Sequence, residues 1–457
     1  MKGGFKMSYD VMKFGAKGDG ITNDAPAIQK AIDECTKTGG RVVLCSGKTF
    51  YASSIVLKSN VELYLEKGSV LKAHSDLDTY LNPNNEPVDY DADIIDAGVV
   101  QKPPYAFIYA KDADNISIAG EGTIDGNAYA FVERWSQYYV NSELYPRPTM
   151  IYVEHCNHIT FCDVTMQKAP FWTLHPAGCD DVLIQNIRIL NDLDMANSDG
   201  IDPDHSKNVR ISGCHITCGD DCICLKATIG NMKYGPTENV IVSDCTLIST
   251  SAAIKIGTEG TGDFRNILVQ DCIVSRSNRG ISVQIRDEGN VENVSFRNIM
   301  IETRRFADTW WGCAEPIAIS VHDRDEHTKA GKISNVRFSN ITCDSENGVF
   351  VSGTEENMVE DIVFDNVQVK MSAKSKWERG MYDLRPGLNK GIEKRQSPGF
   401  YIRCADGVKV RDCRVRFCGE DTSDFAQAFY AENGKNISLE QFDGKAASEQ
   451  FKDIEIL

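Results

Sequence analysis

Three aspartates, Asp199, Asp220 and Asp221, lie in one short stretch of the chain, MANSDGIDPDHSKNVRISGCHITCGDDCICLK at residues 195–226. Carboxylates held close together repel one another, so at least one should have a raised pKa while a neighbour stays ionised. Cleavage of a glycosidic bond uses such a difference, because one carboxyl group protonates the leaving oxygen and another acts on the opposite face of the sugar. The same acids could instead bind calcium or stabilise turns, since aspartate is common in both settings.

A recurring nine-residue phrase determines where these acids lie in space. Each copy opens with a turn residue and then alternates apolar and polar residues, which is the periodicity of a strand. Most copies follow one another at 23 to 31 residues, a period typical of a solenoid that leaves no room for a crossover helix. Stacked strands of this kind form a parallel β-helix. The copies begin at Asn115, His158, Asp181, Asn208, Asn239, Asn266, Asn293, Asn335, Asp361 and Gly407.

Alignment of the coils predicts which side chains are stacked. Four segments fall at one strand position, namely DGID at 199–202, DCIC at 221–224, AAIK at 252–255 and RGIS at 279–282. Matched residues on neighbouring strands lie about 4.8 Å apart. We therefore expect Asp199 directly under Asp221, with Asp220 beside them. Ala252 should lie one coil further on.

The segments N-S-D-G at 197–200 and G-D-D-C at 219–222 resemble the N-T-D-G and G-D-D-C signatures of glycoside hydrolase family 28. This is the polygalacturonase family of the pectin lyase-like superfamily, and FGAKGDGITNDAPAIQKAID, near the start of the chain, resembles that superfamily's N-terminal cap. The resemblance implies a right-handed parallel β-helix and inverting hydrolysis without a metal or other cofactor. By position it implies Asp220 as the general acid, and Asp199 and Asp221 as the residues that hold and activate water. Asn197 would support the site.

Two departures from the family pattern affect the expected substrate. The family's G-H-G falls on Ser-Ala-Ala at 251–253, and its R-I-K, which binds the galacturonate carboxylate, falls on Ser-Val-Gln at 282–284. Neutral side chains cannot replace the charge-assisted hydrogen bonds of the missing Arg and Lys. We therefore expect a sugar that is neutral or differently decorated, and not unsubstituted polygalacturonate. Lys255 and Arg286 lie at neighbouring strand positions, where they could restore positive charge or pair within the protein.

Several polar and aromatic residues near the predicted site are candidates for substrate binding. The paired tryptophans could stack on a sugar or pin a loop, and a lone histidine is more often structural. The candidates are Asn197, Lys255, Gln284, Arg286, His175, Trp310 and Trp311.

Three long insertions follow the phrase, at 127–150, 303–316 and 370–400. Insertions at one point of a coil fall on one side of a solenoid, so we expect them to form the walls of a cleft, although the last could equally be a loose surface loop. Walls that close a groove into a pocket favour exo action on oligosaccharides or small glycosides. A helix at 24–36, inside a cap region at about 9–40, is predicted to close one end. The expected fold is all-β, a single domain over residues 1–457.

The cysteines recur with the phrase. Of the sixteen in the chain, Cys214, Cys245, Cys272 and Cys413 occupy its seventh position, which predicts an interior column of reduced thiols at a bend. No zinc site is predicted, because the pairs near residues 214–224 lack Cys-x-x-Cys spacing.

The composition narrows the range of partners. The net charge of −17 argues against nucleic acid, and no run of about 18 apolar residues predicts a membrane span. The resemblance to family 28 implies a carbohydrate as the partner. The first residues lack the apolar run of a signal peptide, which predicts a cytoplasmic chain. A leader absent from this sequence would leave secretion open.

Three other functions fit the same sequence. Rhamnogalacturonan hydrolases of the family also lack the histidine, which keeps a pectin-derived substrate in view. A lyase on this scaffold would use calcium and a basic residue to abstract a proton. A carbohydrate-binding solenoid without activity would need none of the three acids.

Overall fold

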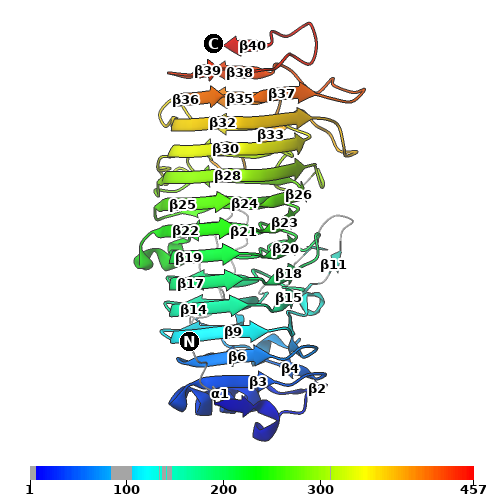
Figure 1. Cartoon of the computed structure of the whole chain (residues 1–457), viewed down its shortest axis with the longest axis vertical. Helices are drawn as coiled ribbons and strands as arrows, with labels where there is room; N and C mark the ends of the chain where they lie inside the picture. Colours follow the sequence, from blue (N-terminus) through cyan, green and yellow to red (C-terminus); the bar gives the residue numbers. More distant parts are fainter. Residues whose placement is uncertain (1–6, 84–104, 133, 136–139, 142–146, 309) are drawn as a thin grey trace. The chain divides into compact units, whose positions relative to one another are not determined.

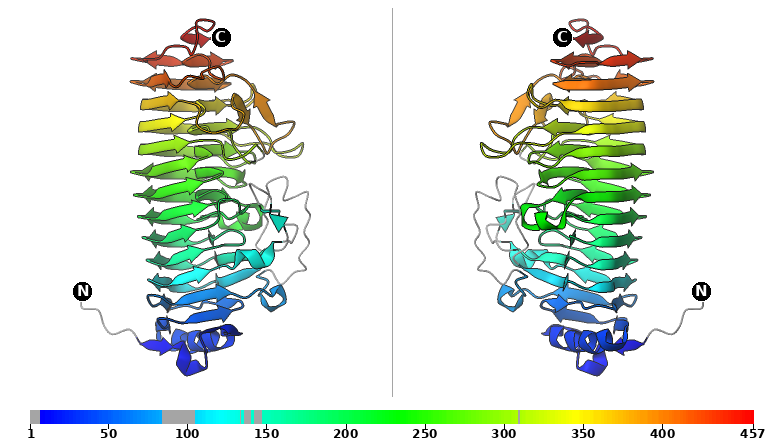
Figure 2. Two further views of the ribbon diagram at one scale, coloured as in Figure 1. Left: turned by 90° about the vertical axis from the view of Figure 1, so that its right-hand side faces the viewer. Right: turned by 90° about the vertical axis from the view of Figure 1, so that its left-hand side faces the viewer.

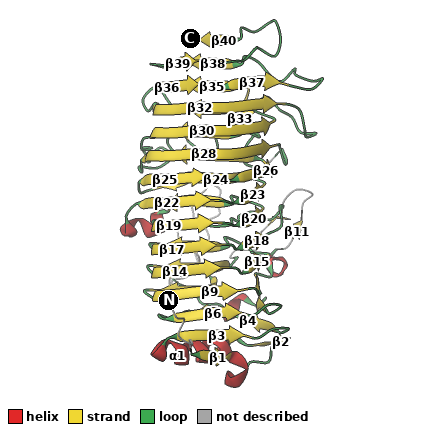
Figure 3. Ribbon diagram, viewed as in Figure 1, coloured by secondary structure: helices red, strands yellow, loops and turns green. Residues whose placement is uncertain are grey.

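The computed structural model describes residues 7–83, 105–132, 134–135, 140–141, 147–308 and 310–457, and strands dominate it (Figure 3). It divides into two compact units, which are considered separately: Met1–Asp91 with Gln101–Gly219, and Ala92–Val100 with Asp220–Leu457. The single domain predicted for residues 1–457 stays a prediction.

The first unit contains three ladders of parallel strands (Figure 1). The first ladder is β1 (Ser8–Asp10), β3 (Gly40–Leu44), β6 (Val61–Leu65), β9 (Asp114–Gly120), β14 (Asn157–Cys162), β17 (Asp180–Gln185) and β19 (Lys207–Ser212). The second is β2 (Asp19–Asn23), β4 (Thr49–Ala52), β7 (Val70–Ala73), β10 (Thr123–Asp125), β15 (Thr165–Gln167), β18 (Arg188–Leu190) and β20 (His215–Cys218). The third is β5 (Ile55–Val56), β8 (Ala106–Lys111), β13 (Thr149–Glu154) and β16 (Leu174–Ala177).

The second unit repeats the arrangement. Its first two ladders comprise β22 (Thr237–Ser243), β23 (Thr246–Ser249), β25 (Phe264–Gln270), β26 (Ile273–Ser277), β28 (Val291–Thr303), β30 (Ser334–Ser345), β32 (Val359–Met371), β36 (Ala405–Arg411), β37 (Arg414–Phe417) and β39 (Ser438–Glu440). Its third ladder is β21 (Ile223–Ala227), β24 (Ala252–Gly260), β27 (Arg279–Ile285), β29 (Ile317–Val321), β31 (Val349–Ser352), β35 (Phe400–Arg403), β38 (Phe429–Glu432) and β40 (Ile454–Ile456).

Short elements outside the ladders are few among the described residues. They are the 3-10 helices η1 (Val11–Phe14), η2 (Leu77–Thr79), η3 (Ala128–Phe131) and η4 (Ile229–Tyr234), and the antiparallel pairs β11 (Arg134–Trp135) with β12 (Val140–Asn141) and β33 (Met381–Asp383) with β34 (Ile392–Lys394). None of the helices in the described part of the chain has the length and hydropathy needed to cross a membrane.

The register of the strands confirms the parallel β-helix predicted from the phrases. In the first unit Ile116 pairs with Ile159, Val182 and Val209 in turn, all at the second position of a phrase. The second unit continues the same position through successive coils, with the residues Val240, Ile267, Val294, Val336, Ile362 and Val408. These apolar side chains point inward and are buried, so each coil packs on the next.

The residue that opens each phrase adopts the left-handed backbone conformation, with φ from 49° to 76° at all ten positions. Asn, Asp and Gly tolerate this conformation best, which explains the turn residues noted in the sequence. The side chains also form a ladder along the exterior, because Asn293 Nδ2 donates to Asn266 Oδ1 (2.7 Å) and Asn266 Nδ2 donates to Asn239 Oδ1 (3.0 Å).

The predicted cysteine column is confirmed as a buried feature of the bend. Each thiol donates to the carbonyl two residues earlier, over 3.1 to 3.4 Å, in Cys214, Cys245, Cys272 and Cys413. All four are free thiols. The small, weakly polar side chain therefore fills the corner and satisfies a carbonyl there.

The helix predicted at 24–36 forms as α1 (Ala25–Thr38), which covers one end of the first unit's strands (Figure 1). Asp24 precedes the helix, and its carboxylate accepts hydrogen bonds from the backbone N–H groups of Lys17 and Gly18 (2.6 and 2.9 Å). Gly39, with φ of 72°, follows the last residue. One face, including Ile28 and Ile32, is buried.

Replacement of Asn293 tests the left-handed position. Asn293→Ala should destabilise the protein by about 1 kcal/mol more than Asn293→Gly, because alanine pays the steric cost of a positive φ and glycine does not. Both variants lose the same side-chain hydrogen bond, so the difference between their free energies of unfolding reports the backbone cost of a positive φ. Urea unfolding measures this difference, and Ser295→Ala on the same strand is the control. Equal unfolding midpoints for the two Asn293 variants would contradict the explanation.

Candidate active site

The predicted alignment of three segments in the second unit is confirmed. Ile223 of β21 pairs with Ile254 of β24, which pairs with Ile281 of β27. This register places residues 221–224, 252–255 and 279–282 at one strand position, as the phrases predicted.

Asp221 is a buried carboxylate held by three donors from the next coil. Its Oδ1 accepts from Ser251 Oγ (2.8 Å) and the Ala252 N–H (3.0 Å), while its Oδ2 accepts from Lys255 Nζ (2.7 Å). The Asp221 side chain is 2% exposed and that of Lys255 is 17% exposed, so this ion pair is largely shielded from water.

The surroundings of Asp221 keep it ionised. Burial alone would raise the pKa of the carboxyl group, but the charges of Lys255 and Lys226 and the hydrogen bonds from Lys255 and Ser251 outweigh burial and lower the pKa below its ordinary value. Burial likewise opposes the charge on Lys255, yet the carboxylate of Asp221 raises the pKa of that amine.

Asp220 differs from its neighbour in exposure. Its side chain is half-buried, whereas Asp221 is buried. Its Oδ1 accepts the backbone N–H of Asp221 (3.0 Å), and its own carbonyl accepts from Ser249 Oγ (2.6 Å). The two adjacent carboxylates therefore have unequal environments, one partly open to solvent and one enclosed.

Asp199 and Asn197 are positioned within the first unit. Asp199 is buried, and its carbonyl accepts from the Thr173 N–H (2.9 Å) beside β16. Asn197 has φ of 55° and accepts from Arg147 Nη2 (2.8 Å). The buried guanidinium of Arg147 also donates to the carbonyls of Pro170 and Ala196 (2.8 and 2.6 Å). Arg147 was not singled out from the sequence, because it lies in the irregular insertion at 127–150 and outside the repeated phrases.

His175, a candidate for substrate contact, is 1% exposed and lies 3.1 Å from the buried Asp204 (Nε2 to Oδ2). Its ring packs against Tyr152 and Trp172, with centroids 4.9 and 4.8 Å away. These contacts give it a structural setting, and substrate contact stays a prediction. Asp204 was not identified from the sequence, although its place two residues after Asp202 in DGIDPD was a usable signal.

The predicted stacking of Asp199 under Asp221 stays a prediction, because Asp199 belongs to the first unit and Asp220 and Asp221 to the second.

The insertions at 303–316 and 370–400 are joined by buried hydrogen bonds in the second unit, which centre on Arg279 and Asp383. Arg279, one coil beyond Ala252, donates to both carboxylate oxygens of Glu315 (3.1 and 3.2 Å) and to the carbonyl of Asp383 (3.1 Å). The Asp383 carboxylate accepts the Gly312 N–H (2.8 Å). The 370–400 segment, drawn in yellow to orange in Figure 2, is therefore anchored to its neighbours and includes the β33–β34 hairpin. Part of the 127–150 insertion lies outside the described residues.

The two tryptophans of the 303–316 insertion have different settings. Trp310 is 6% exposed and packs edge-on against Phe306 at 5.7 Å between ring centroids. Trp311 is half-buried beneath Arg385, whose Cζ is 5.1 Å from the ring centroid. Asp383 holds Arg385 through two 2.9 Å contacts, to Nε and Nη2. Trp311 is the more exposed of the two, and stacking of either ring on a sugar stays a prediction.

The remaining candidates, Gln284 and Arg286, are buried in β27 and just after it. Gln284 Nε2 lies 3.5 Å from Ser320 Oγ. Arg286 is 0% exposed and donates to Ser320 and to the carbonyl of Pro386 (2.6 Å from Nε). Burial and the neighbouring arginines Arg324 and Arg279 hold its pKa well below the ordinary value. These bonds give Arg286 a structural role, and its contact with substrate stays a prediction.

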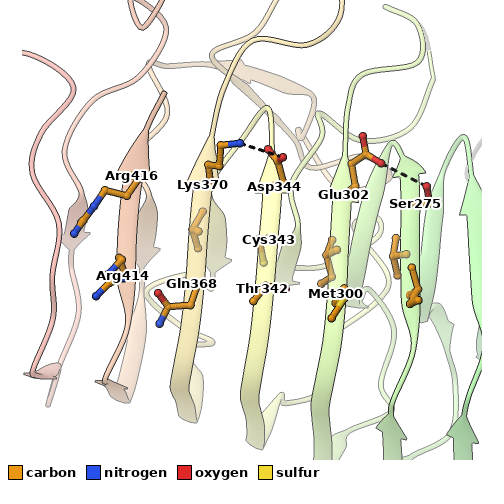
Figure 4. Close-up of a pocket in the computed structure, with 14 residues that line it drawn as sticks. Ser275, Met300, Glu302, Thr342, Cys343, Asp344, Gln368, Lys370, Arg414 and Arg416 are labelled. Carbon is orange, nitrogen blue, oxygen red and sulfur yellow. Dashed lines mark hydrogen bonds and ion pairs between the residues drawn. The ribbon is translucent and has the colours of Figure 1, made fainter. Parts of the chain in front are cut away.

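A groove of about 500 Å³ lies on the outer face of β26, β28, β30, β32 and β37 in the second unit (Figure 4). Its polar rim includes the pairs Ser275 with Glu302 and Asp344 with Lys370. Asp221 and Lys255 lie at the other sheet, formed by β21 and β24, so this groove is not part of the candidate site.

Comparison with known proteins connects this geometry to a family. The model for glycosyl hydrolases family 28 matches residues 87–381, and the model described as rhamnogalacturonase A/epimerase, pectate lyase-like, matches residues 8–86. A probable polygalacturonase of Vitis vinifera is 31% identical over 265 residues, covering 56% of this chain and 52% of the relative. An endo-polygalacturonase of Pectobacterium parmentieri is 26% identical over 366 residues, covering 77% of this chain and 85% of the relative.

A solved structure of an exopolygalacturonase from Thermotoga maritima has the same fold, with a TM-score of 0.68 and 24% identity over 80% of this chain and 87% of that one. The chain spans about half the length of the Vitis vinifera relative. The family 28 match extends over more than half of the chain and contains both aspartate motifs. The chain therefore belongs to glycosyl hydrolase family 28 and has the right-handed parallel β-helix expected for it.

Proposed function

We propose that this chain is an inverting glycoside hydrolase that acts from the end of an oligosaccharide or on a small glycoside. The observation that carries the proposal is the contrast between two adjacent carboxylates, a half-buried Asp220 and a buried Asp221 paired with Lys255. Unlike surroundings of this kind allow one carboxyl group to hold a proton while the other stays ionised. A carboxylate already bound to an ammonium is also poorly suited to bind calcium, which weighs against the lyase alternative.

The proposed reaction assigns one role to each acid. Asp220 transfers its proton to the glycosidic oxygen as the bond from that oxygen to the anomeric carbon breaks. A water on the opposite face, which Asp199 and Asp221 are assigned to hold and activate, attacks the anomeric carbon and passes its proton to one of these two carboxylates. Attack from the opposite face inverts the anomeric configuration.

The surroundings of β27 support a sugar without a free galacturonate carboxylate at the cleavage site. Ser282 and Gln284 are neutral and buried, and Arg286 donates to protein acceptors. The anchored insertions at 303–316 and 370–400 support exo action, because walls restrict the length of glycan that enters. The similar structure from T. maritima is that of an exopolygalacturonase. The free, buried thiols support a cytoplasmic location.

A pectin-derived substrate of the rhamnogalacturonan type is the second candidate. It is favoured by the match of residues 8–86 to the model named for rhamnogalacturonase A/epimerase.

Product stereochemistry tests the reaction. A panel of aryl glycosides and pectic oligosaccharides should include a substrate whose first product has the inverted anomeric configuration. Proton magnetic resonance measures this configuration as the product forms. Unsubstituted polygalacturonate should be a poor substrate in the same panel. Retention would contradict the mechanism, and a product that absorbs in the ultraviolet would indicate a lyase.

Replacement of the proposed acid tests its role. Asp220→Asn should lower kcat on an oligosaccharide by on the order of 100- to 10,000-fold, because the leaving oxygen loses its proton donor. The loss should be smaller on a nitrophenyl glycoside, whose leaving group needs less protonation. Asp244→Asn, at an exposed position of the same unit, serves as the control. Unchanged turnover of both substrates in Asp220→Asn would remove the catalytic assignment.

Trp311 can be tested as a sugar platform. Trp311→Ala should raise KM by about 5-fold, from the loss of roughly 1 kcal/mol of stacking, and Trp311→Phe should restore most of it. A lower melting temperature with an unchanged KM would show instead that the residue only holds its loop.

A further inference from the structure

Lys255 is a half-buried lysine that reaches back one coil to Asp221. It lies in β24, where it pairs in register with Cys224 and Ser282. Its Nζ lies 2.7 Å from Asp221 Oδ2. The family's histidine position on the same strand is occupied by Ala252, whose methyl group cannot donate or accept a proton.

The donors to Asp221 divide between its two oxygens. The neutral donors, Ser251 Oγ and the Ala252 N–H, both reach Oδ1, whereas Lys255 reaches Oδ2. A carboxylate that is enclosed by protein takes up a proton unless a cation accompanies it. Among the described residues, Lys255 forms the ion pair with the Asp221 carboxylate.

We propose that Lys255 is a positioning residue for the reaction, which fixes the Asp221 carboxylate and keeps it ionised in acidic solution. The inference rests on the proposed hydrolase function, since Lys255 acts through Asp221 and not on the sugar. Asp221 then remains competent to hold the attacking water at pH values where an unpaired buried acid would be protonated.

Other charged groups also act on this pair. Lys226 lowers the pKa of Asp221 together with Lys255, and Cys224, Lys226 and Asp220 influence Lys255. Asp199 is a further neighbour predicted by the sequence. Removal of Lys255 therefore leaves Lys226 as partial compensation, so Asp221 should lose part of its stabilisation as an anion and not all of it.

Activity as a function of pH tests the proposal. In Lys255→Met, the acid limb of kcat/KM should move to higher pH by about 1 to 3 units, the range expected for loss of a close opposite charge. The basic limb should move in the same direction by less, because Lys255 also acts on Asp220. Lys255→Arg should restore the original profile. The substrate is the member of the glycoside panel with the highest turnover.

A surface pair provides the matched control. Lys332 Nζ lies 2.8 Å from Glu360 Oε1, but the two side chains are 61% and 42% exposed. Lys332→Met should leave both limbs in place. A raised KM with an unchanged profile in Lys255→Met would overturn the proposal and make Lys255 a substrate-binding residue.

Thermal stability provides a readout that needs no substrate. A lowered folded-state pKa means that the Asp221 pair stabilises the protein above the unfolded-state pKa, near 4, and that this contribution is lost as pH falls. The difference in melting temperature between the native protein and Lys255→Met should therefore be larger at pH 7 than at pH 4. An equal difference at both pH values would overturn the inference.

The two readouts separate this inference from the proposed function. If no member of the glycoside panel were hydrolysed, the proposed function would fail, while the melting data would still show whether Lys255 keeps Asp221 ionised. Should Lys255→Met not fold, Lys255→Gln gives the same comparison with a polar side chain of similar length.

Discussion

Each coil of this protein has to turn at the same point, and a residue with positive φ allows it to do so. Ten phrases begin with such a residue, from Asn115 to Gly407, and the strands that follow pair in register within each unit. Because apolar and polar residues alternate along each strand, the apolar side chains stack in the interior, while the turn residues stack on the exterior. Because this geometry repeats, the placement of residues 221, 252 and 279 follows from the register.

The candidate site uses this regular frame to hold groups that are costly to bury. Asp221 is enclosed, yet it remains charged because Lys255, Ser251 and a backbone N–H converge on it from the next strand. Asp220 is adjacent in sequence, but it lies at the bend between β20 and β21 and is half-buried. A rigid stack can therefore present two neighbouring carboxyl groups in unlike surroundings, one enclosed and paired with a lysine and one half-buried.

Much of this could be predicted because it depends on period and register. The parallel β-helix, the cysteine column and the alignment of Asp221 with Ala252 all follow from the spacing of the phrases, and the N-terminal helix follows from its own start and stop residues. The partners of irregular segments could not be predicted in the same way. The contacts of Arg279 with Glu315 and Asp383 join residues more than 30 positions apart through loops without a period. Arg286 lies just after β27, where the sequence left open a role in substrate binding or pairing within the protein, and its contact with the carbonyl of Pro386 depends on an irregular segment.

The anchoring of the 370–400 insertion bears on how such a protein could change its substrate range. Arg279 is part of the coil that follows Ala252, and it also holds Glu315 and the carbonyl of Asp383. A loop transplanted from a relative would leave this guanidinium buried without its acceptors unless the underlying coil changed with it. The wall and the coil beneath it thus form one module, and diversification of this part of the protein should proceed by exchange of whole modules more readily than by exchange of loops.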